Sequence, residues 1–151
     1  LNPNNILVNE NCQLRVCDFG LARASFHEEY VPFWTNYVAT RWYRAPELIL
    51  THSNKYSTAL DMWSVGCIFA EMLSRGRPLF PGADAREQFD LITRVTGRPS
   101  FDVIDRLHPR EVREYLRNLP VRPRIILATI FPYADPAAIY LLGGFLEFDA
   151  D

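Results

Sequence analysis

The segment from Thr58 to Leu73 constrains the fold more than any other stretch of this sequence. Drawn as a helix, it carries apolar residues on every side, namely Leu60, Met62, Trp63, Val65, Cys67, Ile68, Phe69, Met72 and Leu73. A helix that is apolar all round is buried inside a protein core. The pattern therefore predicts a central helix over residues 58–73 with other elements around it. Thr58 and Asp61 have the spacing of a capping pair at its start.

The composition of the chain is typical of one globular unit with a hydrophobic core. It has 151 residues, of which 48% are hydrophobic, and a net charge of −2. Because this balance implies no broad basic face, we expect no nucleic-acid partner. No apolar run is long enough to span a bilayer, so we expect no membrane association. Three cysteines without a C-x-x-C spacing indicate a reducing compartment.

Local patterns predict a mainly α fold with one small β-hairpin. Two short apolar runs at the N-terminal end, separated by polar residues, predict the hairpin: Ile6–Val8 and Leu14–Cys17. Further helices are expected over 85–96, 101–105 and 111–119, and from Asp135 toward Phe148. Gly143 and Gly144 fall within the last of these helices, where each costs roughly 1 kcal/mol relative to Ala.

The stretch from Asp18 to Glu47 carries the clearest functional pattern. It opens with Asp18-Phe19-Gly20 and closes with Ala45-Pro46-Glu47. Between them lie Thr35-Asn36-Tyr37 and then the run Val38 to Arg44. An Asp-x-Gly alone is a common turn, but the two triplets at this separation form a specific pattern. The stretch resembles the activation segment of the eukaryotic protein kinases, and the Thr-x-Tyr with the run that follows narrows the resemblance to the MAP kinases.

This resemblance runs from Leu1 to Asp151 and implies a protein-kinase-like C-terminal lobe, a partial kinase domain. Its parts would be the end of the catalytic loop, the activation segment over 18–47, the central helix over 58–73 and the MAP kinase insert over about 97–132. We expect the N-terminal lobe to be absent, because the Gly-rich loop, the strand Lys and its Glu partner are not found in the sequence. The His-Arg-Asp that carries the catalytic base is also not found.

The resemblance implies that the hairpin holds the nucleotide and its metal. Asn5 would be the catalytic-loop Asn and Asp18 the metal-binding Asp, which together bind Mg²⁺ beside the phosphates of ATP. The alternative is that Asn5 and Asp18 are ordinary turn residues, but their spacing across a hairpin counts against it. Leu7 and Cys17 would lie against the nucleotide, although core packing explains them almost as well. Cys12 would line a peptide-docking groove or be a buried small residue.

Two further residues are implied to act in catalysis. Asn2 stands where the family has Lys, beside the transferring phosphoryl group. Thr40 is expected to reach back to the catalytic loop and help to place its acid. Trp42 and Tyr43 are expected to pack the substrate-facing floor.

The activation segment is implied to be a phosphorylation switch. Thr35 and Tyr37 would be the phosphoacceptors, and each phosphate adds roughly −1.5 to −2 charge. Arg23 is expected to bind phospho-Thr35, while Arg41 and Arg44 bind phospho-Tyr37, since Arg suits bidentate phosphate contacts. The alternative is that Arg23, Arg41 and Arg44 are solvated surface residues that bind no phosphate.

Two acidic residues are implied to have structural roles. Glu47 would be buried and would pair with an Arg that the family has at a position after Asp151. Asp61 would hydrogen-bond the backbone of the catalytic loop and could cap its own helix at the same time.

The implied activity is transfer of the γ-phosphate of MgATP to Ser or Thr followed by Pro in protein substrates. The implied partners are these substrates, an upstream dual-specificity MAP kinase kinase and docking peptides, and the implied location is the cytoplasm and nucleus. We expect the 151 residues alone to be inactive. One alternative is a pseudokinase or docking module, which Asn2 favours and Asn5 and Asp18 oppose. Another is a truncated gene product without a stable fold.

Overall fold

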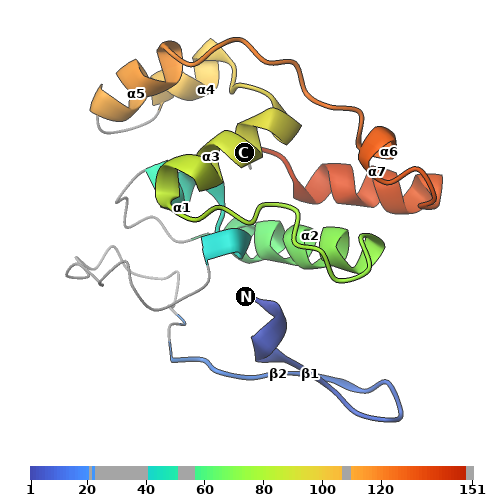
Figure 1. Ribbon diagram of the computed structural model, residues 1–151. Helices are drawn as coiled ribbons and strands as arrows, with labels where there is room; N and C mark the ends of the chain where they lie inside the picture. The colour runs from blue at the N-terminus through green and yellow to red at the C-terminus, as the bar shows by residue number, and fades with distance from the viewer. Residues whose placement is uncertain (21, 23–40, 51–56, 107–109, 149–151) are drawn as a thin grey trace.

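The computed structural model describes residues 1–20, 22, 41–50, 57–106 and 110–148 (Figure 1). Over these ranges the chain is mainly helical with one two-stranded antiparallel sheet, as the sequence predicts. Figure 1 shows the sheet at one end of the helical body, beside the N-terminus. Within the described ranges, no helix combines the length and the hydropathy needed to cross a membrane.

The predicted hairpin is confirmed. Strand β1 (Ile6–Val8) pairs with strand β2 (Leu14–Val16), and Ile6 lies opposite Val16. The Asn9 side chain stabilises the turn by accepting the backbone N–H of Gln13 at 2.8 Å. Leu7 is 56% exposed, so core packing does not explain it. Cys12 is also exposed, and its alternative interpretation as a buried small residue is therefore wrong.

The central helix α2 (Ala59–Leu73) is confirmed, with two corrections. Thr58 occupies the N-cap position, but its side chain makes no capping hydrogen bond, so the predicted capping pair does not form. Burial is also incomplete, since Met62 and Met72 are 46% and 71% exposed. The physical reason is that η2 (Arg41–Tyr43) and α7 (Pro136–Phe145), which pack most closely on α2, cover only part of its circumference.

Helix α7 lies along α2 and closes the main core. A Cβ at Gly66 of α2 would come within 2.7 Å of the Phe145 Cβ, so glycine permits this close approach. Leu142 and Leu146 are buried between the two helices. The helix runs through Gly143 and Gly144 and ends at Phe145, short of the expected Phe148. Packing against α2 thus offsets the low helix propensity of the two glycines.

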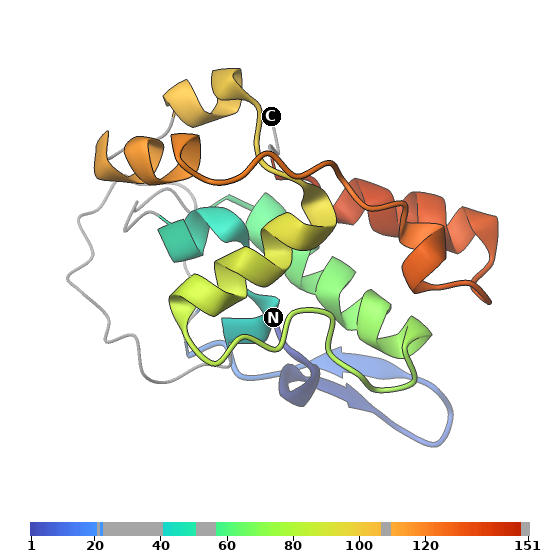
Figure 2. The ribbon, with the colours of Figure 1, turned by 45° about the horizontal axis from the view of Figure 1, so that its top comes forward.

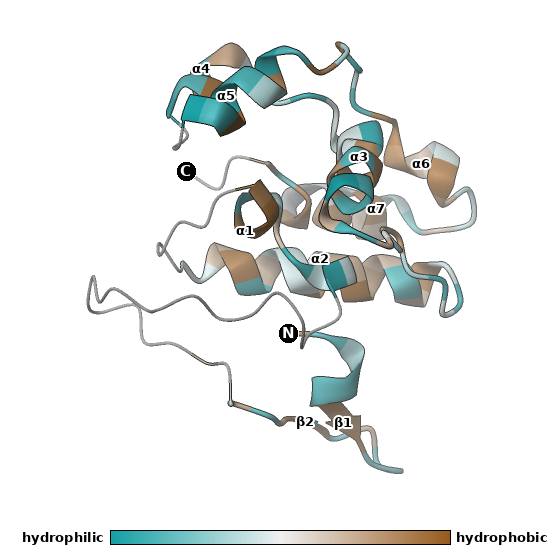
Figure 3. Ribbon diagram, turned by 60° about the vertical axis from the view of Figure 1, so that its left-hand side comes forward, coloured by the Kyte–Doolittle hydropathy of each residue, from teal (hydrophilic) through white to brown (hydrophobic). Residues whose placement is uncertain are grey.

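Three of the remaining helices form a second, smaller layer around α3 (Ala85–Thr96), whose predicted bounds are confirmed. Figure 2 shows α3 lying across α2. The three are α1 (Pro46–Leu50), α4 (Phe101–Arg106) and α5 (Arg110–Arg117), whereas α6 (Leu127–Ile130) packs on α7 and adds Leu127 to the main core. Phe89, Ile104 and Leu116 form a second core there. Figure 3 shows hydrophobic residues along α6 and mostly hydrophilic ones over α5. The sequence had not predicted α1, α6 or η2.

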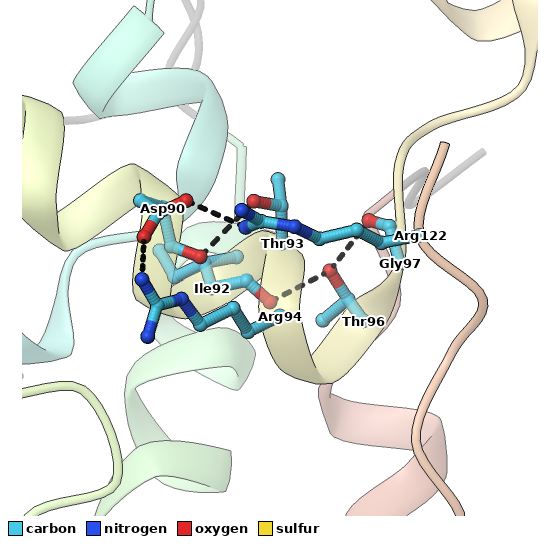
Figure 4. A network of polar contacts seen from close by, with 7 residues as sticks. All are labelled: Asp90, Ile92, Thr93, Arg94, Thr96, Gly97 and Arg122. Atoms are coloured by element: carbon cyan, nitrogen blue, oxygen red, sulfur yellow. Dashed lines mark hydrogen bonds and ion pairs between the residues drawn. The ribbon is translucent and has the colours of Figure 1, made fainter. Parts of the chain in front are cut away.

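An ion-pair network fixes the segment after α5 onto α3 (Figure 4). The Asp90 carboxylate lies between two guanidinium groups, 2.5 Å from Arg122 and 2.6 Å from Arg94. The Ile125 N–H also donates to the Val95 carbonyl at 2.9 Å. The hydrogen bond from Arg122, reinforced by Arg94, lowers the pKa of Asp90. The network therefore stabilises the fold only while Asp90 is ionised.

We expect Asp90→Asn to lower the free energy of unfolding by about 1 kcal/mol at neutral pH, a value kept small because the pair is partly exposed. Since the pKa of Asp90 is lower in the folded state, its contribution is complete above the unfolded pKa and is lost as pH falls through the folded pKa. Urea unfolding should show the two proteins converging in acid. Asp102→Asn on α4 is the matched control, because Asp102 is exposed. An equal difference at neutral and acidic pH would contradict this account.

Candidate active site

A short 3₁₀ turn, η1 (Pro3–Asn5), carries the first candidate residues. Asn2 is its N-cap, and the Asn2 Oδ1 accepts the N–H of Asn4 at 2.9 Å. Pro3 at the first position of the turn has a suitable fixed φ. Asn2 therefore has a structural task that the sequence did not indicate. It holds the turn that presents Asn5.

The hairpin brings Asn5 and Asp18 to the same end of the sheet. Asn5 directly precedes β1, and the Cys17 N–H donates to the Asn5 carbonyl at 2.8 Å. Cys17 is half-buried, with its thiol 4.0 Å from the Asn4 carbonyl. Since Asp18 follows Cys17 directly, both candidate ligands stand where the two strands of the hairpin begin and end.

Asp18 has an unusual backbone conformation. Its φ is 59°, in the left-handed region that Asp and Asn tolerate better than most residues. The Asp18 Oδ1 accepts the N–H of Gly20 at 3.4 Å, which supports this turn. Such strained residues concentrate at functional sites, so the outlier supports a functional role for Asp18.

The residues at this end of the hairpin fit a magnesium ion. Mg²⁺ prefers hard oxygen ligands, and it is usually held by one or two carboxylates together with substrate phosphates and water. Asp18 supplies an exposed carboxylate and Asn5 an amide oxygen. A bound Mg²⁺ would neutralise charge on the phosphates of ATP, and these two residues would hold it.

The beginning of the chain is tied to the central helix. The Asp61 Oδ1 lies 3.4 Å from the main-chain nitrogen of Leu1. This contact places the start of α2 beside the segment that leads into Asn2 and Asn5. The Asp61 side chain is 67% exposed, so the contact adds little stability. The role of Asp61 in ordering the catalytic loop remains a prediction.

The turn η2 forms the second half of the candidate site. The Ser64 Oγ of α2 donates to the Tyr43 carbonyl at 2.8 Å, and the Tyr43 hydroxyl donates to the Glu71 Oε2 at 2.6 Å. Burial, together with the hydrogen bond to Glu71, raises the pKa of Tyr43 well above its usual range. Tyr43 therefore stays neutral and anchors η2 to α2 at two points, Ser64 and Glu71.

The candidate phosphate-binding arginines at this turn are partly buried. Arg41 donates to the Ala83 carbonyl at 2.7 Å, so its guanidinium is already held against the loop before α3. Arg44 is half-buried two residues beyond Trp42. Glu47 lies on α1, and burial raises the pKa of its carboxyl. Glu47 is half-buried, and its pairing with an Arg stays a prediction.

Several predicted site residues lie outside the described part of the chain. They are Arg23, Thr35, Tyr37 and Thr40, which the sequence assigns to phosphorylation, phosphate binding and placement of the catalytic acid. These assignments stay predictions.

Three polar residues at η2 were missed by sequence reasoning. Ser64 and Glu71 lie on α2 and bind Tyr43, while Gln88 of α3 is fully buried at 0% exposure. The sequence did contain a signal for Gln88. It lies four residues before the buried Ile92, so it is a polar residue on the apolar face of the helix.

Comparison with known proteins agrees with this geometry. Residues 1–149 match the protein kinase domain family. Over 150 residues, 99% of this chain, the sequence is 52% identical to mitogen-activated protein kinase 16 of Oryza sativa subsp. japonica and 51% identical to mitogen-activated protein kinase 20 of Arabidopsis thaliana. The chain therefore belongs to the protein kinases and, within them, to the MAP kinases. It spans 30% and 25% of the lengths of these two relatives.

Proposed function

We propose that this chain is part of the C-terminal lobe of a MAP-kinase-like enzyme that transfers the γ-phosphate of MgATP to Ser or Thr of proteins. The observation that carries the proposal is the position of Asn5 and Asp18 at one end of the hairpin, joined through the hydrogen bond from Cys17. Exposed Leu7 and half-buried Cys17 would contact the nucleotide. Catalysis of this kind is mostly positioning and charge stabilisation.

We further propose that the substrate residue is followed by Pro. The run Val38 to Glu47 would form the floor on which this Pro lies. Within it, η2 is bonded to Ser64 of α2 and to Ala83 in the loop before α3. A Pro cannot donate a backbone N–H. If the floor offers no hydrogen-bond acceptor at the position after the phosphorylated residue, every residue other than Pro is disfavoured there. The backbone N–H of such a residue would lose its hydrogen bond to water without gaining a partner.

The activity is best tested in a chimera, in which these 151 residues replace the matching segment of the Oryza sativa mitogen-activated protein kinase 16. We expect the chimera to transfer radiolabelled phosphate from ATP to a protein substrate, and the 151 residues alone to transfer none. The isolated sequence contains neither a Gly-rich loop nor a His-Arg-Asp. A properly folded chimera without activity would contradict the proposal.

We expect activation of the chimera to require phosphorylation of both Thr35 and Tyr37 by an upstream MAP kinase kinase. Two new phosphates would bind Arg23, Arg41 and Arg44 and order the segment, because charge-assisted Arg–phosphate contacts are strong. Mass spectrometry of the active form should find both modifications. Thr35→Ala and Tyr37→Phe should each remove most activity, and an active form unmodified at both positions would refute this regulation.

A docking module without catalysis is the second candidate function. A cavity of about 400 Å³ between α1, α3 and α5, lined by Ile49, Leu50, Phe89 and Tyr115 among others, supports binding of an apolar peptide side chain. In this case the inactive protein would act in the same cytoplasmic and nuclear signalling complexes. Peptide binding to a chimera that transfers no phosphate would favour this function.

A further inference from the structure

Gln88 stands out as a fully buried polar side chain in the first half of α3. A buried amide is costly unless its donors and acceptors are satisfied. The Gln88 Oε1 accepts the N–H of Gly82 at 3.1 Å, and its Nε2 donates to the Trp42 carbonyl at 3.4 Å. One side chain thus joins the loop before α3 to the backbone of η2.

The same loop makes two more contacts with η2. The Trp42 indole N–H donates to the Gly82 carbonyl at 3.0 Å, and Arg41 donates to the Ala83 carbonyl at 2.7 Å. The approach is close, since a Cβ on Gly82 would lie 2.5 Å from the backbone nitrogen of Gln88. The Trp42 ring, the loop and Gln88 therefore form one packed unit. Because the unit is closely packed, the loop cannot rearrange to compensate for a substitution at Gln88.

We infer that Gln88 is a positioning residue that fixes η2 and thereby sets the preference for Pro after the phosphorylated residue. This inference rests on the proposed function, in which η2 belongs to the substrate floor. Gln88 does not itself contact the substrate. It acts by holding the Trp42 backbone, so that the floor keeps the shape that accepts Pro and leaves other residues without a partner.

The first measurement uses the 151-residue chain and needs no activity. Gln88→Met keeps the size of the side chain and removes both hydrogen bonds. We expect amide hydrogen exchange over Arg41–Ala45 to become about tenfold faster, the effect of losing bonds that total about 1.4 kcal/mol. Thr93→Val is the matched control, since Thr93 is buried on the same helix and its hydroxyl donates to the Asp90 carbonyl of that helix. It should leave exchange over Arg41–Ala45 unchanged.

The second measurement compares the kcat/KM of the chimera for a peptide with Ser-Pro and for a peptide with Ser-Ala. We expect Gln88→Met to reduce the ratio of their kcat/KM values about tenfold, and Thr93→Val to leave the ratio intact. Gln88→Leu serves as the second variant if Gln88→Met does not fold. It also removes both hydrogen bonds and buries no charge.

The outcomes separate the inference from the proposed function. Unchanged exchange over Arg41–Ala45 in both Gln88 variants would overturn the inference, whatever the chimera does. Faster exchange with an unchanged peptide ratio would also overturn it. If the phosphorylated chimera with Gln88 intact shows no preference for Pro, the proposed specificity fails. Faster exchange in the Gln88 variants would then support only the anchoring of η2 by Gln88.

Discussion

Asp18→Asn in the chimera is expected to lower kcat/KM by at least about 10³-fold, while the fold remains intact. The substitution removes the negative charge that would hold Mg²⁺ against the phosphates of ATP. A loss of about 4 kcal/mol of transition-state stabilisation corresponds to a rate loss of about 10³-fold. The measurement is steady-state kinetics over a range of Mg²⁺ concentrations, together with thermal unfolding.

The choice of Asn follows from the backbone at this position. Asp18 has a φ of 59°, and Asn adopts this left-handed conformation as readily as Asp does. Asp18→Ala would add a backbone cost of roughly 1–2 kcal/mol, so the two effects could not be separated. Glu10→Gln in the exposed hairpin turn is the matched control for loss of one carboxylate. Activity retained in Asp18→Asn would rule out the metal-binding role.

Asn2→Lys in the chimera is expected to raise kcat by about 10²–10³-fold. A Lys ammonium would offset charge on the transferring phosphoryl group, and one such charged donor contributes about 2–4 kcal/mol to barrier lowering. The gain should appear in kcat more than in KM, because the contact strengthens in the transition state. Against this gain stands the loss of the Asn2 N-cap, whose side chain accepts from Asn4, at a cost of about 1 kcal/mol.

Two variants distinguish charge from capping at Asn2. Asn2→Asp keeps an oxygen acceptor for the Asn4 N–H, and so the cap of η1, but adds a negative charge, so kcat should fall. Asn2→Ala removes the cap without adding charge, and only a small loss is expected. If Asn2→Lys and Asn2→Ala give the same kcat, this position has no electrostatic role in the reaction.

The long periodic elements could be predicted from the sequence because their signals are local. Helix α3 has its predicted bounds, with Asp84 as N-cap and Gly97 after its end. The hairpin is likewise confirmed. Turn η2 and helix α1 were not predicted, because distant residues hold them. Ser64, for example, lies 21 positions along the chain from the Tyr43 carbonyl that it binds.

The candidate site was predicted in part for the same reason. Motif spacing identified Asn5 and Asp18, and the hairpin places them together. The same spacing could not show that Asn2 caps a turn, since that contact depends on the backbone path of Pro3–Asn5. Nor could it find Gln88, whose partners lie on another segment. The sequence interpretation of α2 also overestimated burial at Met62 and Met72, because periodicity does not tell which neighbours are present.

The most direct test of the central claim is the kcat/KM of the doubly phosphorylated chimera for two peptides that differ only in having Pro or Ala after the phosphorylated Ser. If the chain contributes the site of a proline-directed protein kinase, the Ser-Pro peptide should be preferred at least about tenfold, which is 1.4 kcal/mol of differential transition-state binding. Phosphate transfer to both peptides at equal rates would contradict the proposed specificity. No transfer to either, by a folded and doubly phosphorylated chimera, would contradict the account as a whole.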